Sequence, residues 1–218
     1  MKEYKKVLIF TIVLVVFETI TYLLAKFSPF EPTILLSTLD QKLPVIPSFV
    51  MFYYLWYIYL IVLPCIFYYK DKKIFYKYFT LTALSVIIAF FIFFLFPTTI
   101  ERGNINFEEN TIFTILLKII YFTDTPILNC LPSMHCTLCF IFIYLTLKLK
   151  DFKWYYKLLV IITNTLIIVS TLLIKQHVIW DVLAALLLVI ICNKIDRKFN
   201  LSEKFAIKYN EINIKWNI

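Results

Sequence analysis

Residues 78–96 read YFTLTALSVIIAFFIFFLF, a run of nineteen residues without a charge. About 20 mostly apolar residues allow a helix to cross the hydrocarbon core of a bilayer, so this run predicts a membrane-spanning helix. Five further blocks approach the same length: 7–25, 48–69, 131–149, 156–174 and 175–193. The sequence therefore predicts an all-α fold, an integral membrane six-helix bundle.

The composition supports this class. The chain is 61% hydrophobic and 17% charged, whereas soluble domains carry roughly 45–50% apolar and about a quarter charged residues. Too few polar residues remain to cover a soluble surface. No repeat or linker is visible, so residues 1–218 are expected to form one domain with a cytoplasmic tail at about 194–218. A single glycine in the chain argues against a glycine-rich phosphate loop.

One apolar stretch, residues 111–122, is too short to span and contains Lys118. It predicts a short helix lying on the membrane interface before the fourth spanning helix. The first block, 7–25, follows a basic start but lacks a convincing small-residue cleavage site, so we expect it to be retained as a helix.

The positions of Lys and Arg predict the orientation. With six spans, seventeen of the 22 basic residues fall on the side of the two termini and five on the other. Short cytoplasmic loops carry this excess, so both termini should be cytoplasmic in the cell membrane. The net charge of +8 then follows from topology and does not require a nucleic-acid partner.

The two histidines of the chain fall on the outer side with two cations. His135 and His177 each lie near the start of a predicted span, Arg102 follows the third span, and Lys175 precedes His177. An ionisable residue at membrane depth costs roughly 2.5–3.5 kcal/mol to insert. Any one of them could be a satisfied polar group at the headgroup level, but four on one side indicate a functional site.

The segment His177-Val-Ile-Trp-Asp181 pairs a histidine with a carboxylate at a spacing of four residues. On a helix this spacing brings the two side chains together. A carboxylate on one imidazole nitrogen fixes the tautomer and leaves the other nitrogen free as a base or nucleophile.

The segment Leu131-Pro132-Ser133-Met134-His135 is typical of a helix start, because proline is favoured in the first helical turn. A helix beginning here should leave the amides of Ser133, Met134 and His135 unpaired. Free amides beside a hydroxyl form a site suited to phosphate, and His135 would stand where it can protonate a leaving oxygen.

Together these residues resemble the type-2 phosphatidic acid phosphatase family of six-helix membrane enzymes. Ser133 and His135 match its Pro-Ser-x-His motif, and Ser170, His177 and Asp181 match its later Ser-His-Asp motif. The chain departs from the family in having Met134 where glycine is usual and Thr171 where arginine is usual. The family's first motif is not intact, although residues 97–102 resemble a shorter version from the sphingolipid-synthase-like branch.

The resemblance implies a mechanism. His177, oriented by Asp181, would attack phosphorus and form a phosphohistidine, and His135 would act as acid and then base. Arg102, Lys175, Ser133 and the amide of Met134 would bind the phosphate, without a metal or another cofactor.

The implied activity is a membrane lipid phosphatase for a phosphomonoester or pyrophosphate of a lipid, such as phosphatidate, polyprenyl pyrophosphate or phosphatidylglycerophosphate. The partners would be the lipid phosphate substrate and membrane lipids, with no nucleic acid. Alternatives are a phosphotransferase of the inositol-phosphorylceramide synthase type, a small transporter, or an inactive lipid-binding relative.

The sequence alone does not assign a role to three further features. Glu18 lies deep in the first predicted helix and needs a partner. The aromatic residues within 52–57 are interpreted as an interfacial belt, with a lid over the lipid headgroup as the alternative. Cys130, Cys136 and Cys139 are interpreted as small apolar residues, although a metal site or a Cys130–Cys136 disulfide is an alternative.

Overall fold

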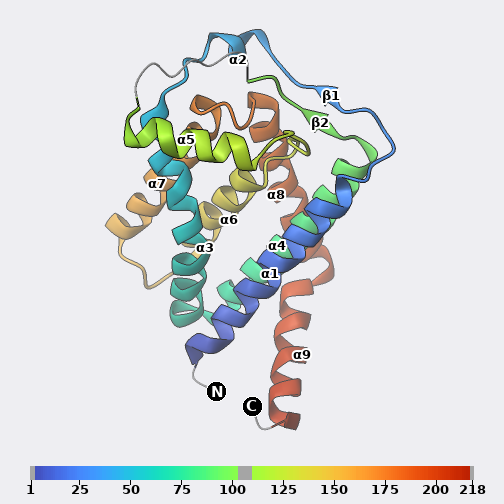
Figure 1. Cartoon of the computed structure of the whole chain (residues 1–218). Helices are drawn as coiled ribbons and strands as arrows, with labels where there is room; N and C mark the ends of the chain where they lie inside the picture. The colour runs from blue at the N-terminus through green and yellow to red at the C-terminus, as the bar shows by residue number, and fades with distance from the viewer. Residues whose placement is uncertain (1–2, 103–109, 217–218) are drawn as a thin grey trace.

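A computed structural model describes residues 3–102 and 110–216, and it is almost entirely helical (Figure 1). The long helices are α1 (Glu3–Ala25), α3 (Val50–Lys70), α4 (Lys72–Leu95), α6 (Met134–Lys148), α7 (Trp154–Leu173), α8 (Ile179–Phe199) and α9 (Leu201–Trp216). The short ones are α2 (Thr38–Lys42), α5 (Ile112–Thr123) and a 3-10 turn, Pro47–Phe49. The predicted all-helical class is confirmed.

Helix α4 occupies the centre of the bundle and contacts α1, α3, α6, α8 and α9, while α6 also packs against α7 and α8. The interior is apolar and aromatic, as where Tyr78 of α4 stacks on Phe142 of α6. The outward faces are apolar as well, and Ile12 and Leu23 of α1 are each about half exposed. A bundle that is apolar on both its inner and outer faces belongs in lipid.

Within the described residues, four helices are long and apolar enough to cross a membrane: 7–25, 47–70, 72–95 and 154–173. Helix α6 has only 15 residues, or roughly 22 Å at 1.5 Å per residue, and α8 carries Asp196, Arg197 and Lys198 near its end. These four helices fit a membrane protein, and the count of six spans remains a prediction.

Helix α8 begins four residues later than the predicted block 175–193, so the predicted start of this helix was wrong. The amides of Gln176 and His177 both donate to the Thr171 carbonyl, at 2.9 and 3.0 Å, so they complete the last turn of α7. Lys175 has a left-handed backbone with φ 51°, which reverses the chain. Helix α8 therefore begins only at Ile179, while α6 begins after its cap at Ser133.

The segment predicted as a tail begins inside α8 and continues as α9. Asn200, with φ 50°, joins the two helices. Helix α9 then packs on α4, with the ring of Phe205 stacked on Phe79 at 4.8 Å and edge-on to Phe10 of α1 at 5.9 Å. Figure 1 places both termini at the end of the bundle away from the strands.

The opposite end is closed by loops and two short strands (Figure 1). Strand β1 (Thr33–Ile34) pairs in parallel with β2 (Thr98–Thr99), a feature that the all-α prediction missed. The Thr98 hydroxyl accepts hydrogen bonds from the amides of Cys130 and Leu131, so β2 fixes the chain just before α6. Helix α5 forms where the interfacial helix was predicted, and its placement at an interface stays a prediction.

Candidate active site

His177 and Asp181 meet at the start of α8. The Nδ1 atom of His177 lies 3.0 Å from Oδ2 of Asp181, and the same oxygen accepts the amide of Val178 at 3.0 Å. Asp181 is fully buried. Because a carboxylate accepts hydrogen bonds, it favours a proton on Nδ1 and leaves Nε2 of His177 available as a nucleophile or base.

Ser133 caps α6 and joins the two motifs. Its Oγ accepts the amide of Cys136 at 3.2 Å, and its own amide donates to the Asp181 carbonyl at 3.3 Å. The expectation that the Ser133 amide is unpaired is therefore wrong. The amides of Met134 and His135 remain in the first turn of the helix, where no intrahelical acceptor exists.

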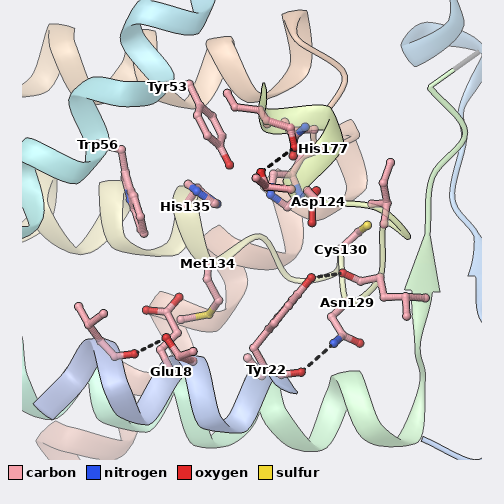
Figure 2. A pocket seen from close by; sticks show the side chains of 18 of the residues that line it. Glu18, Tyr22, Tyr53, Trp56, Asp124, Asn129, Cys130, Met134, His135 and His177 are labelled. Atoms are coloured by element: carbon pink, nitrogen blue, oxygen red, sulfur yellow. Dashed lines mark hydrogen bonds between the residues drawn. The ribbon is translucent and has the colours of Figure 1, made fainter. Parts of the chain in front are cut away.

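His135 lies between aromatic rings of α3. Its ring stacks on Tyr53, with centroids 4.7 Å apart, and tilts against Trp56 at 4.2 Å. The centroid of His177 is 5.8 Å away, and within the described residues Nε2 of His135 is buried without a hydrogen-bond partner. Figure 2 shows this group of side chains. Tyr53 and Trp56, two of the aromatic residues interpreted as an interfacial belt, contact this histidine, and the belt interpretation itself stays a prediction.

A cavity of about 440 Å³ opens beside both histidines, between α1, α3, α4 and the chain leading into α6 (Figure 2). Its aromatic and polar wall includes Glu18, Tyr22, Tyr53, Tyr54, Trp56, Tyr57, Asp124, Asn129, Met134, His135, Gln176 and His177. Its apolar wall includes Val15, Leu60, Val86, Ala89 and Phe93. The volume and the mixed wall are typical of a small-molecule site.

Arg102 reaches the site but is paired. Its Nη2 lies 3.1 Å from Oδ2 of Asp124, and its guanidinium sits 4.1 Å above the ring centre of Tyr121. When the amide group of Gln176 is turned so that its oxygen and nitrogen exchange places, the oxygen accepts a hydrogen bond from Arg102 and the nitrogen donates one to Asp124. Burial lowers the pKa of Arg102 and raises the pKa of Asp124, and the ion pair opposes both shifts.

Lys175 lies on another side of His177. Its Nζ donates to the Asp40 carbonyl of α2 at 2.6 Å, while Asp40 Oδ1 accepts the amide of Ile179 at 2.9 Å. A second cavity, of about 360 Å³, is lined there by Asp40, Arg102, Lys175 and His177. His177 thus borders both cavities, and the two predicted cations border the second.

Two further predicted features concern Ser170, which lines neither cavity, and the cysteines, of which Cys130 lines the larger one. Ser170 is fully buried in α7 and donates to the Ile167 carbonyl at 2.6 Å. All five cysteines are free thiols, so the alternative Cys130–Cys136 disulfide is not formed.

The motifs and the cavity can be compared with known protein families. The sequence profile of the PAP2 superfamily matches residues 26–194, more than half of the chain and every predicted site residue. The chain belongs to the PAP2 superfamily. Its members are phosphatases, and this membership supports a phosphoester hydrolase. Searches of curated proteins and of solved structures gave no match.

Sequence reasoning about this PAP2 site missed several of its contacts. Nothing in the sequence linked Asp124 to Arg102, and the only signal was an acidic residue beside the predicted interfacial helix. The spacing of Tyr53 and Trp56, three residues apart on α3, was a weak signal for a shared face. Glu18 was recognised as needing a partner, and the structure adds that it lines the larger cavity.

Proposed function

We propose that this PAP2 superfamily member is a membrane lipid phosphatase that cleaves a lipid phosphomonoester or pyrophosphate through a phosphohistidine. One observation carries the proposal. His177 is oriented by Asp181 at 3.0 Å and borders the same cavity as His135, whose Nε2 has no partner among the described residues. This is the pairing of an oriented nucleophile with a separate acid that the reaction requires.

In the first step, Nε2 of His177 attacks phosphorus and a phosphorus–nitrogen bond forms. The bond from phosphorus to the leaving oxygen breaks, and His135 gives that oxygen a proton. In the second step a water molecule attacks phosphorus and loses a proton to His135. The phosphorus–nitrogen bond then breaks, which releases phosphate and restores both histidines. A phosphotransferase would differ only in using a lipid alcohol instead of water.

Fixed positive charge takes the place of a metal in this proposal. The fork of Arg102 matches phosphate oxygens, Lys175 adds a point charge, and the amides of Met134 and His135 point from the start of α6. The Ser133 oxygen caps the helix, and in this proposal its hydroxyl would turn to donate its proton to a bound phosphate. A bound phosphate would compete with Asp124 for Arg102, since both offer anionic oxygens to the same guanidinium.

The hydrocarbon of the lipid would follow the apolar wall of the larger cavity. Val86, Ala89 and Phe93 of α4 line that wall. We place the site at the outer face of the cell membrane, with six spanning helices and both termini in the cytoplasm, because this arrangement follows the bias of basic residues.

The first test of the function is phosphate release by the purified protein in detergent. The substrates would be phosphatidate, polyprenyl pyrophosphate and phosphatidylglycerophosphate. We expect release from at least one of them, undiminished by excess EDTA and inhibited by vanadate, which mimics five-coordinate phosphorus. Loss of activity in EDTA with rescue by zinc or magnesium would identify a metal enzyme instead. Transfer of the phosphoryl group to an added lipid alcohol in preference to water would identify a phosphotransferase.

The orientation can be tested by labelling cysteine reporters in intact cells, in a background with Cys65→Ala. Glu31 and Lys73 are both exposed. Glu31 lies two residues before β1, and Lys73 lies in the first turn of α4. A membrane-impermeant thiol reagent should label Glu31→Cys and leave Lys73→Cys unmodified until the cells are opened. Labelling of Lys73→Cys alone in intact cells would invert the orientation and place the site in the cytoplasm.

A further inference from the structure

Asp40 is a buried carboxylate that the proposed chemistry does not use. It belongs to α2, in the segment between α1 and α3, and only 3% of its surface is exposed. A carboxylate kept out of water needs hydrogen-bond donors. One of its oxygens holds α2 itself, since Oδ2 accepts both the amide of Ser37, at 3.0 Å, and the hydroxyl of the same residue. The other oxygen contacts a distant part of the chain.

That second oxygen, Oδ1, binds the start of α8. It accepts the amide of Ile179, the first residue of the helix, at 2.9 Å. The first amides of a helix have no acceptor within it, and the cap residue Val178 has a hydrocarbon side chain that cannot accept a hydrogen bond. Asp40 therefore supplies an acceptor from α2, and its negative charge is favoured at the start of a helix.

The backbone of Asp40 holds the chain on the other side of His177. Its carbonyl accepts a hydrogen bond from Nζ of Lys175 at 2.6 Å. Lys175 lies two residues before His177, and Ile179 lies two residues after it. The two contacts of Asp40 thus flank the proposed nucleophile.

The turn between α7 and α8 needs support of this kind. Lys175 has a left-handed backbone with φ 51°, a conformation that costs free energy in a residue other than glycine. The segment after α2 contacts the same turn at a second point, where the amide of Ile46 donates to the carbonyl of Leu173 at 3.0 Å. The segment between α1 and α3 therefore braces the turn that carries His177.

We propose that Asp40 is a positioning residue for His177. By holding Ile179 and Lys175, it fixes the turn between them and keeps the imidazole oriented toward phosphorus. The inference rests on the proposed phosphatase function. Among the described residues Asp40 lines the second cavity and not the larger one, so its loss should slow the chemical step and leave lipid binding almost unchanged.

The test is Asp40→Ala in the purified full-length protein, with a lipid phosphate that the wild type hydrolyses. We expect kcat to fall by about tenfold to a hundredfold, since a displacement of about 1 Å near a reacting group can cost about 10²-fold. KM should change by about threefold or less, because the variant loses stabilisation of the transition state and not binding of the lipid. Asp40→Asn keeps an oxygen that can accept the amide of Ile179, so it should recover most of the lost kcat.

A single-turnover measurement separates positioning from a loss of folded protein. When the enzyme is in saturating excess over the substrate, an inactive fraction does not change the rate constant, because the active molecules still bind all of the substrate. The rate constant should fall in Asp40→Ala by the same factor as kcat. A rate constant equal to that of the wild type would overturn the proposal.

Asp71→Ala is the matched control. The carboxylate of Asp71 caps α4 by accepting the amide of Lys73 at 2.9 Å, so this change removes a similar cap from a helix that carries none of the proposed catalytic residues. The variant should have a lower Tm than the wild type and the same single-turnover rate constant. Equal losses of rate in Asp71→Ala and Asp40→Ala would contradict a specific role of Asp40.

Ile179→Pro tests the same hydrogen bond from its donor side, and it decides the question even where Asp40→Ala does not fold. Proline is favoured at the first position of a helix and has no amide N–H to donate. The variant should lose kcat and retain KM as Asp40→Ala does, and a kcat equal to that of the wild type would overturn the proposal. Absence of phosphate release by the wild type would instead refute the phosphatase function and the inference with it, so the two failures are distinguishable.

Discussion

His177→Ala should abolish phosphate release, with a loss of about 10⁴-fold or more, because the proposed nucleophile is removed. The phosphoenzyme should disappear with the activity. In the wild type, acid-labile phosphate bound to protein should be trapped within the first turnover by rapid quenching with labelled substrate. In His177→Ala no such species should form at any time.

The variant should keep its fold, because His177 is a half-buried residue between helices and its loss leaves the caps of α8 in place. Elution in detergent and the helical circular dichroism spectrum should match those of the wild type. A phosphoenzyme that persists in His177→Ala and disappears in His135→Ala would show that His135 is the nucleophile and His177 is the acid.

His135→Ala should impair substrates in proportion to how much their leaving group needs a proton. A positioned general acid contributes about 10²–10⁴-fold, so alkyl phosphates should lose rate in that range. Nitrophenyl phosphate should lose about tenfold or less, since its phenolate leaves without a proton. The measurement is kcat/KM for an alkyl and an aryl phosphate with the wild type and the variant.

His135 also fills the space between Tyr53 and Trp56, so alanine leaves a gap that could disturb the site by itself. His135→Phe retains the aromatic packing without a proton to give, and it should reproduce the selective loss on alkyl phosphates. Equal losses on both substrates in His135→Phe and His177→Ala, without a phosphoenzyme in the wild type, would favour direct attack by water.

The sequence by itself determined the features that arise within short segments. Apolar runs of about 20 residues predicted the long helices α1, α3, α4 and α7. The four-residue spacing of His177 and Asp181 predicted their contact, which holds at 3.0 Å although His177 lies just outside α8. The cap of α6 at Ser133 agrees with the preference of serine for helix starts, whereas Pro132, which was expected in the first helical turn, lies before the cap.

The contacts of the two cations, Arg102 and Lys175, could not be predicted from short segments of the sequence. Arg102 and Lys175 were both found near His177, yet their side chains are held by groups distant in sequence. Arg102 pairs with Asp124, and Lys175 reaches the carbonyl of Asp40. Both contacts depend on how the loops at one end of the bundle fold over each other, which no spacing in the sequence records.

Only the tertiary structure decided which residues share the cavity. Tyr53 and Trp56 lie about 80 residues before His135, and Glu18 lies still earlier. The membrane helices that carry them are apolar on nearly every side, so their sequences hold little hydrophobic asymmetry to reveal which face turns inward. In such a helix the rotation about its axis is set by packing against its neighbours, and it is this rotation that directs Glu18 and Trp56 into the site.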